Sequence, residues 1–169
     1  MKTINDLKLE GKRVLVRVDF NVPLNKSLEV TDDTRIRATI PTIKAIMEKG
    51  GHPVLMSHLG RPDGIRNPEF SLKSVVAKLE ELSGKKVKFV EDCIGEEAVS
   101  ASKQLGNDEI LMLENLRFYN EETDGDEEFA RRLSENGDVY INDAFGTAHR
   151  AHASTAIIAR FFPKSTAAG

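Results

Sequence analysis

The chain has 169 residues, 40% of them hydrophobic and 30% charged, which predicts one soluble globular domain large enough to bury a core. The formal net charge of −3 argues against general nucleic-acid or membrane-surface binding, and no apolar run approaches the roughly 18–20 residues of a membrane span. The N-terminus lacks the apolar segment of a secretory signal and Cys93 is the one cysteine, so we expect no internal disulfide and a cytoplasmic location.

Short apolar segments alternate with amphipathic segments along the whole chain. In residues 13–18, valines alternate with Arg13, Leu15 and Arg17, which is the period of a β-strand. The predicted strands are residues 13–18, 53–57, 86–90, 110–113 and 139–142. The predicted helices begin at residues 31–33 (with a break near Pro41), at Ser71, at Gly95 and at Thr123 or Asp124, the last running to Asn136, and a short helix is expected at 155–160.

Strands that alternate with helices predict an α/β fold with a parallel sheet. Every loop that follows a strand then opens on the same edge of the sheet, which is where ligands bind in such folds. Several of these loops carry Arg or His, so the expected ligand is an anion. The chain ends where another strand–helix step could continue, so we expect the fifth strand, 139–142, to lie near an unfinished edge and the chain to be a fragment.

Two of the basic segments follow the first and second strands. In HLGR, His58, Gly60 and Arg61 combine an imidazole, a backbone that a ligand can approach closely and a guanidinium that can fork onto two oxygens. The alternative is a surface turn with a solvated arginine. Arg17 lies within a strand, where a charge needs a partner, so it either pairs with Asp19 or another neighbour or faces the cleft.

Further basic residues lie at a helix start and after the last two strands. Arg35 stands where the helix dipole disfavours a cation, which indicates either a function or pairing with Asp32 and Asp33. Arg117 is either a ligand contact or is neutralised by Glu114. The densest basic group is His149, Arg150 and His152, for which a solvated loop is the alternative.

Other polar features carry less functional signal. The acidic run 121–128 is expected to be a helix start and a solvated face, and Cys93 an inert thiol. The two histidines of AHRAH lack acidic or cysteine partners at metal-site spacing, so no metal site is predicted. Neither GxxxxGK[ST] nor GxGxxG occurs, so the chain has no recognisable nucleotide-phosphate loop.

The same segments resemble the N-terminal domain of the phosphoglycerate kinase family. The resemblance rests on RVDFNVP, TRIRA–PTI, SHLGRP, LENLRF and NDAFGTAHRAHAST, which follow in the family's order from about Lys12 onward. It implies a parallel sheet with helices on both faces, a Rossmann-like three-layer sandwich that forms the N-terminal half of a two-domain kinase. By this resemblance, residues 1–169 are the phosphoglycerate-binding domain, and the nucleotide-binding C-terminal domain is absent.

The resemblance also implies roles for individual residues. Members of the family transfer a phosphoryl group between 1,3-bisphosphoglycerate and ADP, giving 3-phosphoglycerate and ATP in glycolysis. The implied catalytic residue is Arg35, which would stabilise the phosphoryl group in flight. The implied substrate-binding residues are Asp19, Phe20, Asn21, Arg35, His58, Leu59, Gly60, Arg61, Arg117 and Arg150, supported by Arg17, His149 and His152.

The expected partners follow from the same resemblance. They are 3-phosphoglycerate or 1,3-bisphosphoglycerate and the C-terminal nucleotide domain, which would bind Mg²⁺ with ADP or ATP; no nucleic acid or membrane is expected. We therefore expect a monomer that binds 3-phosphoglycerate weakly and lacks kinase activity on its own. The alternative is a non-catalytic anion-binding module or an isolated folding fragment.

Overall fold

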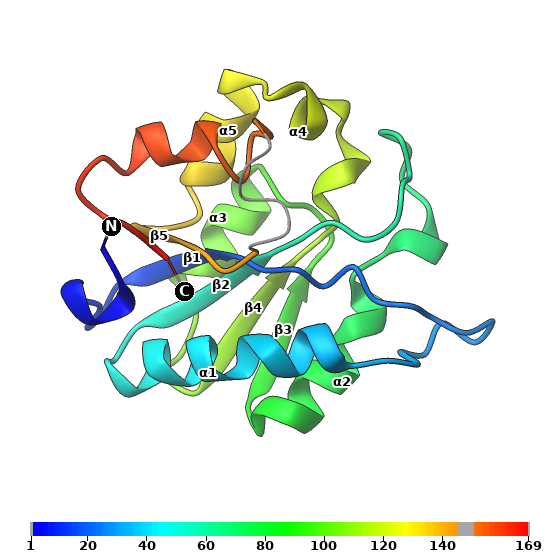
Figure 1. Cartoon of the computed structure of the whole chain (residues 1–169), viewed down its shortest axis with the longest axis horizontal. Helices are drawn as coiled ribbons and strands as arrows, with labels where there is room; N and C mark the ends of the chain where they lie inside the picture. Colours follow the sequence, from blue (N-terminus) through cyan, green and yellow to red (C-terminus); the bar gives the residue numbers. More distant parts are fainter. Residues whose placement is uncertain (1, 145–150, 169) are drawn as a thin grey trace.

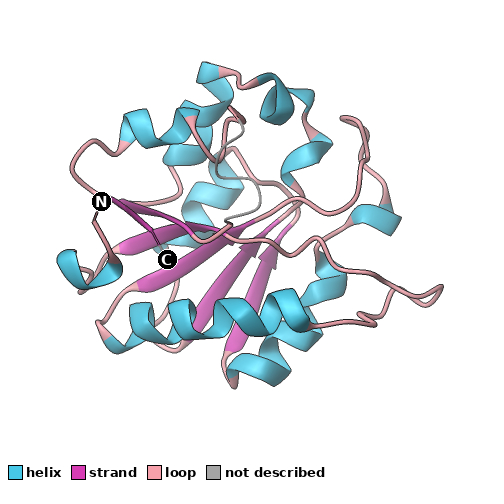
Figure 2. Ribbon diagram, in the orientation of Figure 1, coloured by secondary structure: helices cyan, strands magenta, loops and turns pink. Residues whose placement is uncertain are grey.

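A computed structural model of the chain describes residues 2–144 and 151–168. Within these residues a six-stranded sheet has the order β3-β4-β2-β1-β5-β6, and every pair of neighbours is parallel (Figure 2). The strands are β1 (Arg13–Arg17), β2 (His52–Met56), β3 (Lys86–Val90), β4 (Glu109–Leu113), β5 (Val139–Asn142) and β6 (Thr166–Ala168). The predicted parallel α/β fold is confirmed.

Helices cover both faces of this sheet. The α-helices are α1 (Thr34–Glu48), α2 (Lys73–Ser83), α3 (Glu96–Lys103), α4 (Asn120–Asp124) and α5 (Glu127–Ser134). Short 3-10 helices are η1 (Ile4–Asp6), η2 (Pro68–Phe70), η3 (Leu116–Phe118) and η5 (Ile157–Phe161). In Figure 1, α1 and α2 lie below the sheet, and α3, α4 and α5 lie above it. The molecule is therefore a three-layer sandwich.

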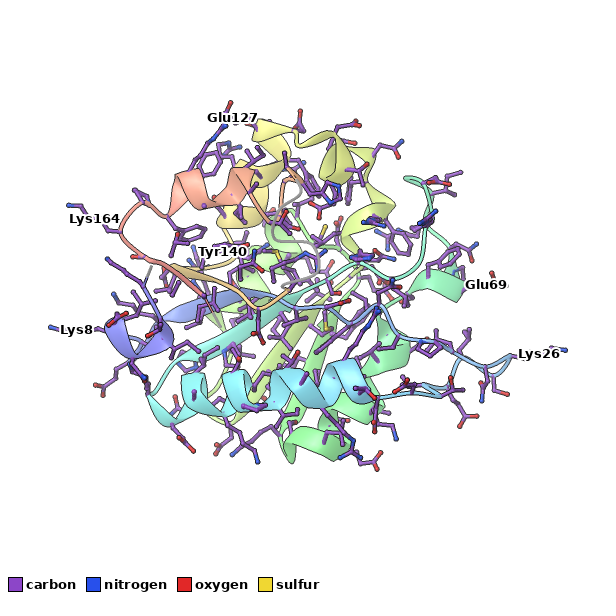
Figure 3. The ribbon with its side chains drawn as sticks, in the orientation of Figure 1. Lys8, Lys26, Glu69, Glu127, Tyr140 and Lys164 are labelled. Carbon is purple, nitrogen blue, oxygen red and sulfur yellow. The ribbon has the colours of Figure 1, made fainter. Side chains whose placement is uncertain are left out.

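The alternation of side chains along each strand builds the two halves of the core. Val14 and Val16 of β1 belong to the cluster under α1 and α2, whereas Leu15 belongs to the cluster on the opposite face. In β5, Tyr140 points to that second face, where its ring stacks on Phe162 with centroids 6.0 Å apart (Figure 3). Arg17 has the parity of Leu15, so its charged group enters the half of the core that holds α4 and α5.

The helix that follows β1 is continuous, contrary to the expected break near Pro41. The helix α1 runs from Thr34 to Glu48 with Pro41 inside it. Proline removes one intrahelical hydrogen bond, but Ile36, Ile43 and Ile46 line one buried stripe on both sides of it. Burial of this stripe against the sheet holds the two halves on one axis. Pro41 itself is exposed, so its ring does not disturb the core.

The opposite error occurs after β4, where one helix was predicted and two are present. The short α4 ends at Gly125, which adopts φ +65° and packs against the backbone of Ala151. Asp126 then caps α5 by accepting a hydrogen bond from the Phe129 N–H at 2.8 Å. The cap was thus predicted two or three residues too early. The expected helix at 155–160 is present as the 3-10 helix η5.

The expected unfinished edge beside β5 is also wrong. Strand β6 pairs with β5 from Tyr140 to Asn142, and Thr3 forms a bridge with Ala168 on its far side. The Ala168 N–H donates to the Lys2 carbonyl at 3.1 Å, so the two ends of the chain lie together, as Figure 1 shows. Among the described residues, no helix is long and apolar enough to cross a membrane.

Candidate functional site

The topology opens the carboxyl edge of the sheet at two places. The chain leaves β1 and β2 toward the face of α1 and α2, and it leaves β4 and β5 toward the opposite face. Since β1 neighbours β5 and β2 neighbours β4, the loops diverge between each pair. Such divergence points are where open α/β sheets bind ligands. The predicted basic segments follow these four strands.

The segment after β1 is held on its neighbours by backbone and side-chain bonds. Asn21 Oδ1 accepts from the Gly60 N–H at 2.8 Å, which ties this segment to the one after β2. Phe20 is fully buried and its N–H donates to Ser57 Oγ at 2.9 Å, so it offers a ligand no side-chain surface. Asp19 is half-buried, and its Oδ1 accepts from the Asn21 N–H at 3.2 Å, which caps this turn. Of the three predicted contacts here, Asp19 and Asn21 present polar groups.

Arg35 reaches this same segment from the first turn of α1. Its Nη1 donates to the Asn21 carbonyl at 2.6 Å and lies 3.5 Å from the Asp19 carboxylate. The alternative, a pairing with Asp32 and Asp33, is not what holds it, because Asp33 pairs with Arg37 at 2.8 Å and Asp32 Oδ1 accepts from Thr34. The Arg35 side chain remains 53% exposed and can turn toward a bound anion.

The HLGR segment departs from a simple surface turn. His58 and Leu59 are buried, and Arg61 is exposed. Gly60 adopts φ +62°, and an added Cβ would lie 2.5 Å from the Phe70 ring, so this glycine is required by a contact within the protein. The next residue, Arg61, lines a cavity together with Arg117, which follows β4.

A buried asparagine that was not predicted fixes this arrangement. Asn115 Oδ1 accepts from the N–H groups of Leu59 and Arg117 at 3.2 and 3.0 Å, and Nδ2 donates to the carbonyls of Leu59 and Phe70 at 2.7 and 2.8 Å. It clamps the segments after β2 and β4 together. The available signal was the N of LENLRF, an amide that follows Glu114 two positions after the end of a strand.

Glu114 was one expected partner of Arg117, and its carboxylate accepts hydrogen bonds from three other groups. Its carboxylate accepts from Ser71 Oγ at 2.6 Å and from the Leu72 and Asn115 N–H groups at 2.8 and 2.9 Å. The carboxylate therefore anchors the start of α2. Arg117 lines the cavity beside this segment.

That cavity has a volume of about 230 Å³ and a mainly polar lining. Arg61, Arg117 and His152 contribute to it from three separate segments, after β2, β4 and β5, and Asp63 supplies one carboxylate. The remaining lining residues are Tyr119, Asn120 and Thr123. Two guanidinium groups and an imidazole around a polar hollow of this size suit a phosphate or carboxylate group.

The electrostatics of His58 report the same convergence. The pKa of His58 is lowered to about 3, first by burial and then by the positive charges of Arg17, Arg117, His152 and Arg35, in that order. These groups come from four parts of the chain. His149 and Arg150 lie outside the described residues, so their predicted place in the patch stays a prediction.

Other predicted features have simple structural places. Cys93 is buried, and burial raises the pKa of its thiol, which agrees with the expected inert role. The acidic run 121–128 is not wholly solvated, because Glu122 is fully buried. Across residues 2–144 and 151–168, no group of three or more His, Cys, Asp or Glu side chains could hold a metal ion.

Comparison with known proteins agrees with this geometry. The family model for phosphoglycerate kinase matches residues 4–169. The chain belongs to the phosphoglycerate kinase family. It is 54% identical over 164 residues to phosphoglycerate kinase of Borreliella burgdorferi and 53% identical over 165 residues to the cytosolic enzyme of Triticum aestivum. These alignments cover 96% and 98% of the chain.

Solved structures of the family share the fold. Phosphoglycerate kinase from Pyrococcus horikoshii superposes with a TM-score of 0.88 at 32% identity, over 100% of this chain and 42% of that one. The structure from Coxiella burnetii gives 0.85 at 35% identity, over 99% and 41%. The chain spans 42% and 41% of the length of the Borreliella and Triticum relatives.

Proposed function

We propose that the chain is the phosphoglycerate-binding domain of a phosphoglycerate kinase. Its substrate would be 3-phosphoglycerate or 1,3-bisphosphoglycerate, held at the carboxyl edge of the sheet. The observation that carries this proposal is the polar cavity of about 230 Å³ at which Arg61, Arg117 and His152 meet from three loops. Asp19 and Asn21, at the neighbouring divergence point, would contact the hydroxyl and carboxyl end of the glycerate.

The roles within the site follow from the contacts. Phosphoryl transfer needs positioning and charge neutralisation more than covalent chemistry, and one arginine can contribute about 10³–10⁵ in rate. Arg35 fits that role because its guanidinium is half-exposed and lies outside the cavity, on the side of Asn21. Phe20, Leu59 and Gly60 would shape the site without contacting the ligand, since their side chains are buried or absent and their N–H groups donate to Ser57, Asn115 and Asn21.

The nucleotide would belong to a second domain. The chain spans about 41% of the length of its relatives, and it contains no GxxxxGK[ST] or GxGxxG phosphate loop. Mg²⁺ with ADP or ATP would bind to that other domain in a cytoplasmic, monomeric enzyme. The 169-residue chain alone would then bind phosphoglycerate without turning over ATP.

Calorimetric titration of the chain with 3-phosphoglycerate tests the proposal. Four charge-assisted hydrogen bonds at about 1.5–3 kcal/mol each give about 6–12 kcal/mol, against an association cost of about 4–15 kcal/mol, so binding is expected to be modest. Inorganic phosphate is the control ligand and should bind more weakly. If phosphate and 3-phosphoglycerate bind alike, the chain is a general anion-binding module instead.

A further inference from the structure

A chain of buried hydrogen bonds runs under the site and ends on His58. Arg17 is fully buried, its Nε donates to Ser154 Oγ at 2.8 Å, and its Nη2 lies 2.9 Å from His58 Nδ1. The Arg17 Nη1 also donates to the carbonyl of Val18. One guanidinium thus joins the strand β1, the segment after β5 and the segment after β2.

The counter-charge for this arginine lies behind the serine. The Ser154 hydroxyl donates to Glu122 Oε2, and the Ser154 N–H donates to Oε1 at 2.9 Å. Tyr140 further fixes Ser154 by donating its hydroxyl to the Ser154 carbonyl at 2.7 Å. With Ser154 and Glu122 both fully buried, Arg17 has one well-defined position from which to reach the histidine.

The contact between Arg17 and His58 determines where the imidazole proton sits. A guanidinium carries only N–H donors, so the nitrogen 2.9 Å from Nη2 must offer a lone pair. Nδ1 is therefore unprotonated, and the ring proton is on Nε2. A doubly protonated ring would turn this hydrogen bond into a contact between two donors of like charge.

The remaining neighbours of His58 oppose a second proton as well. The charged or titratable groups that act on it are Arg17, Arg117, His152 and Arg35, all of which raise the positive potential when protonated. Glu122 lies on the far side of Ser154 and faces Arg17. His58 is also only 5% exposed, so water does little to stabilise an imidazolium.

We propose that Arg17 is a positioning residue of the site: its bond to Nδ1 fixes His58 as the neutral tautomer with the proton on Nε2, which then serves a bound anion as a neutral hydrogen-bond donor. The fixed tautomer is a property of the free protein. Its use by an anion rests on the proposed function. The positive charge at the site then comes from the arginines, and the contribution of His58 stays constant between about pH 8 and pH 5.

Two-bond ¹H–¹⁵N correlation spectra of the ligand-free, ¹⁵N-labelled chain test this proposal, with His58→Gln assigning the ring signals. The expected result is the pattern of a neutral ring protonated on Nε2, unchanged from about pH 8 to about pH 5. A ring protonated on Nδ1, an equal mixture of tautomers, or an imidazolium that forms near the ordinary pKa would overturn it.

Variants then distinguish a specific effect of Arg17 on His58 from a general disturbance of strand β1. In Arg17→Lys the compact ammonium cannot bridge Ser154 and His58 at once, so the second tautomer should appear and the ring should titrate at higher pH. The matched control is Arg13→Lys on the same strand, which breaks the bonds to Asp138 and should leave the His58 spectrum unchanged. If Arg17→Lys does not fold, Ser154→Ala removes the Nε acceptor and should also release some of the second tautomer. An unchanged tautomer in the folded variant contradicts the role of Arg17.

Ligand binding supplies the last distinction. If the free protein shows the Nε2 tautomer but 3-phosphoglycerate does not bind, the inference about Arg17 stands and the proposed function fails. If 3-phosphoglycerate binds to a protein whose His58 is protonated on Nδ1, the inference fails and the function stands. With the expected tautomer and bound ligand, the shift of the Nε2–H signal should exceed that of His52, which lies at the opposite end of β2.

Discussion

At the scale of single residues, a variant of Arg35 should change ligand binding without changing stability. The contact of Arg35 with Asp19 is 3.5 Å long and half-exposed, and such ion pairs contribute about 0–1 kcal/mol. Arg35→Ala should therefore leave the urea midpoint almost unchanged while weakening 3-phosphoglycerate binding about tenfold or more, the loss of one charge-assisted hydrogen bond.

The control for this variant stands two positions away. Arg37 pairs with Asp33 at the start of the same helix and, unlike Arg35, does not line the hollow beside Asn21. Arg37→Ala should change neither the calorimetric affinity nor the midpoint by much. Equal loss of affinity in both variants would show that Arg35 acts only through the net charge of the helix.

The lowered pKa of His58 makes stability depend on pH in a defined direction. Between its folded pKa of about 3 and its ordinary value of 6.5, the unfolded chain binds a proton that the folded chain does not. The contribution of His58 to the free energy of unfolding is therefore fully present above about pH 6.5. It decreases as the pH falls, by about 2 kcal/mol at about pH 5. Urea unfolding at about pH 7 and pH 5 should show this loss of stability in the unmodified chain and a smaller loss in His58→Gln. Identical losses in the two proteins would refute the role of His58.

At the scale of the elements, Pro41 distinguishes one helix from two. In a continuous α1 the proline costs a hydrogen bond and strains the preceding turn, so Pro41→Ala should stabilise the chain by up to about 3 kcal/mol. If a second helix began at Pro41, the proline would be favourable and its loss neutral or harmful. The midpoint of urea unfolding distinguishes one helix from two. The control is Lys44→Ala, at an exposed position of the same helix.

Gly60 tests the packing that presents Arg61. Gly60→Ala must place a Cβ 2.5 Å from the Phe70 ring at φ +62°, whereas Gly84→Ala meets nothing within 4 Å at φ +69°. Both variants lose about 1–2 kcal/mol to the left-handed backbone, and Gly60→Ala should lose about 1–3 kcal/mol more through overpacking. Equal midpoints in urea would mean that Phe70 moves aside freely.

At the scale of the whole molecule, the sequence predicted the central strands of the sheet better than its edge strand. The alternation of Val14, Leu15 and Val16 is strong enough to identify a strand and both of its faces. Strand β6 has no such signal, because its three residues form a strand only through pairing with β5 and with Thr3. Partners far along the chain decide such a strand, and local pattern does not contain them.

The convergence of residues at the candidate site was predictable where loops follow strands, and unpredictable where the partner is buried. The loops predicted the meeting of Arg61, Arg117 and His152. Glu122 was expected to be a solvated acid in a charged run, and only the fold brings it to Ser154 and Arg17. Its burial could not be inferred from a stretch whose other residues are mostly exposed.

The most direct test of the account is to map 3-phosphoglycerate onto the backbone of the chain by amide NMR. Shifts should concentrate in residues 19–21, 58–61 and 117–120 and around His152, because the four loops share one edge of the sheet. Shifts confined to the opposite edge of the sheet, or none at millimolar ligand, would contradict the claim that these loops form one anion site.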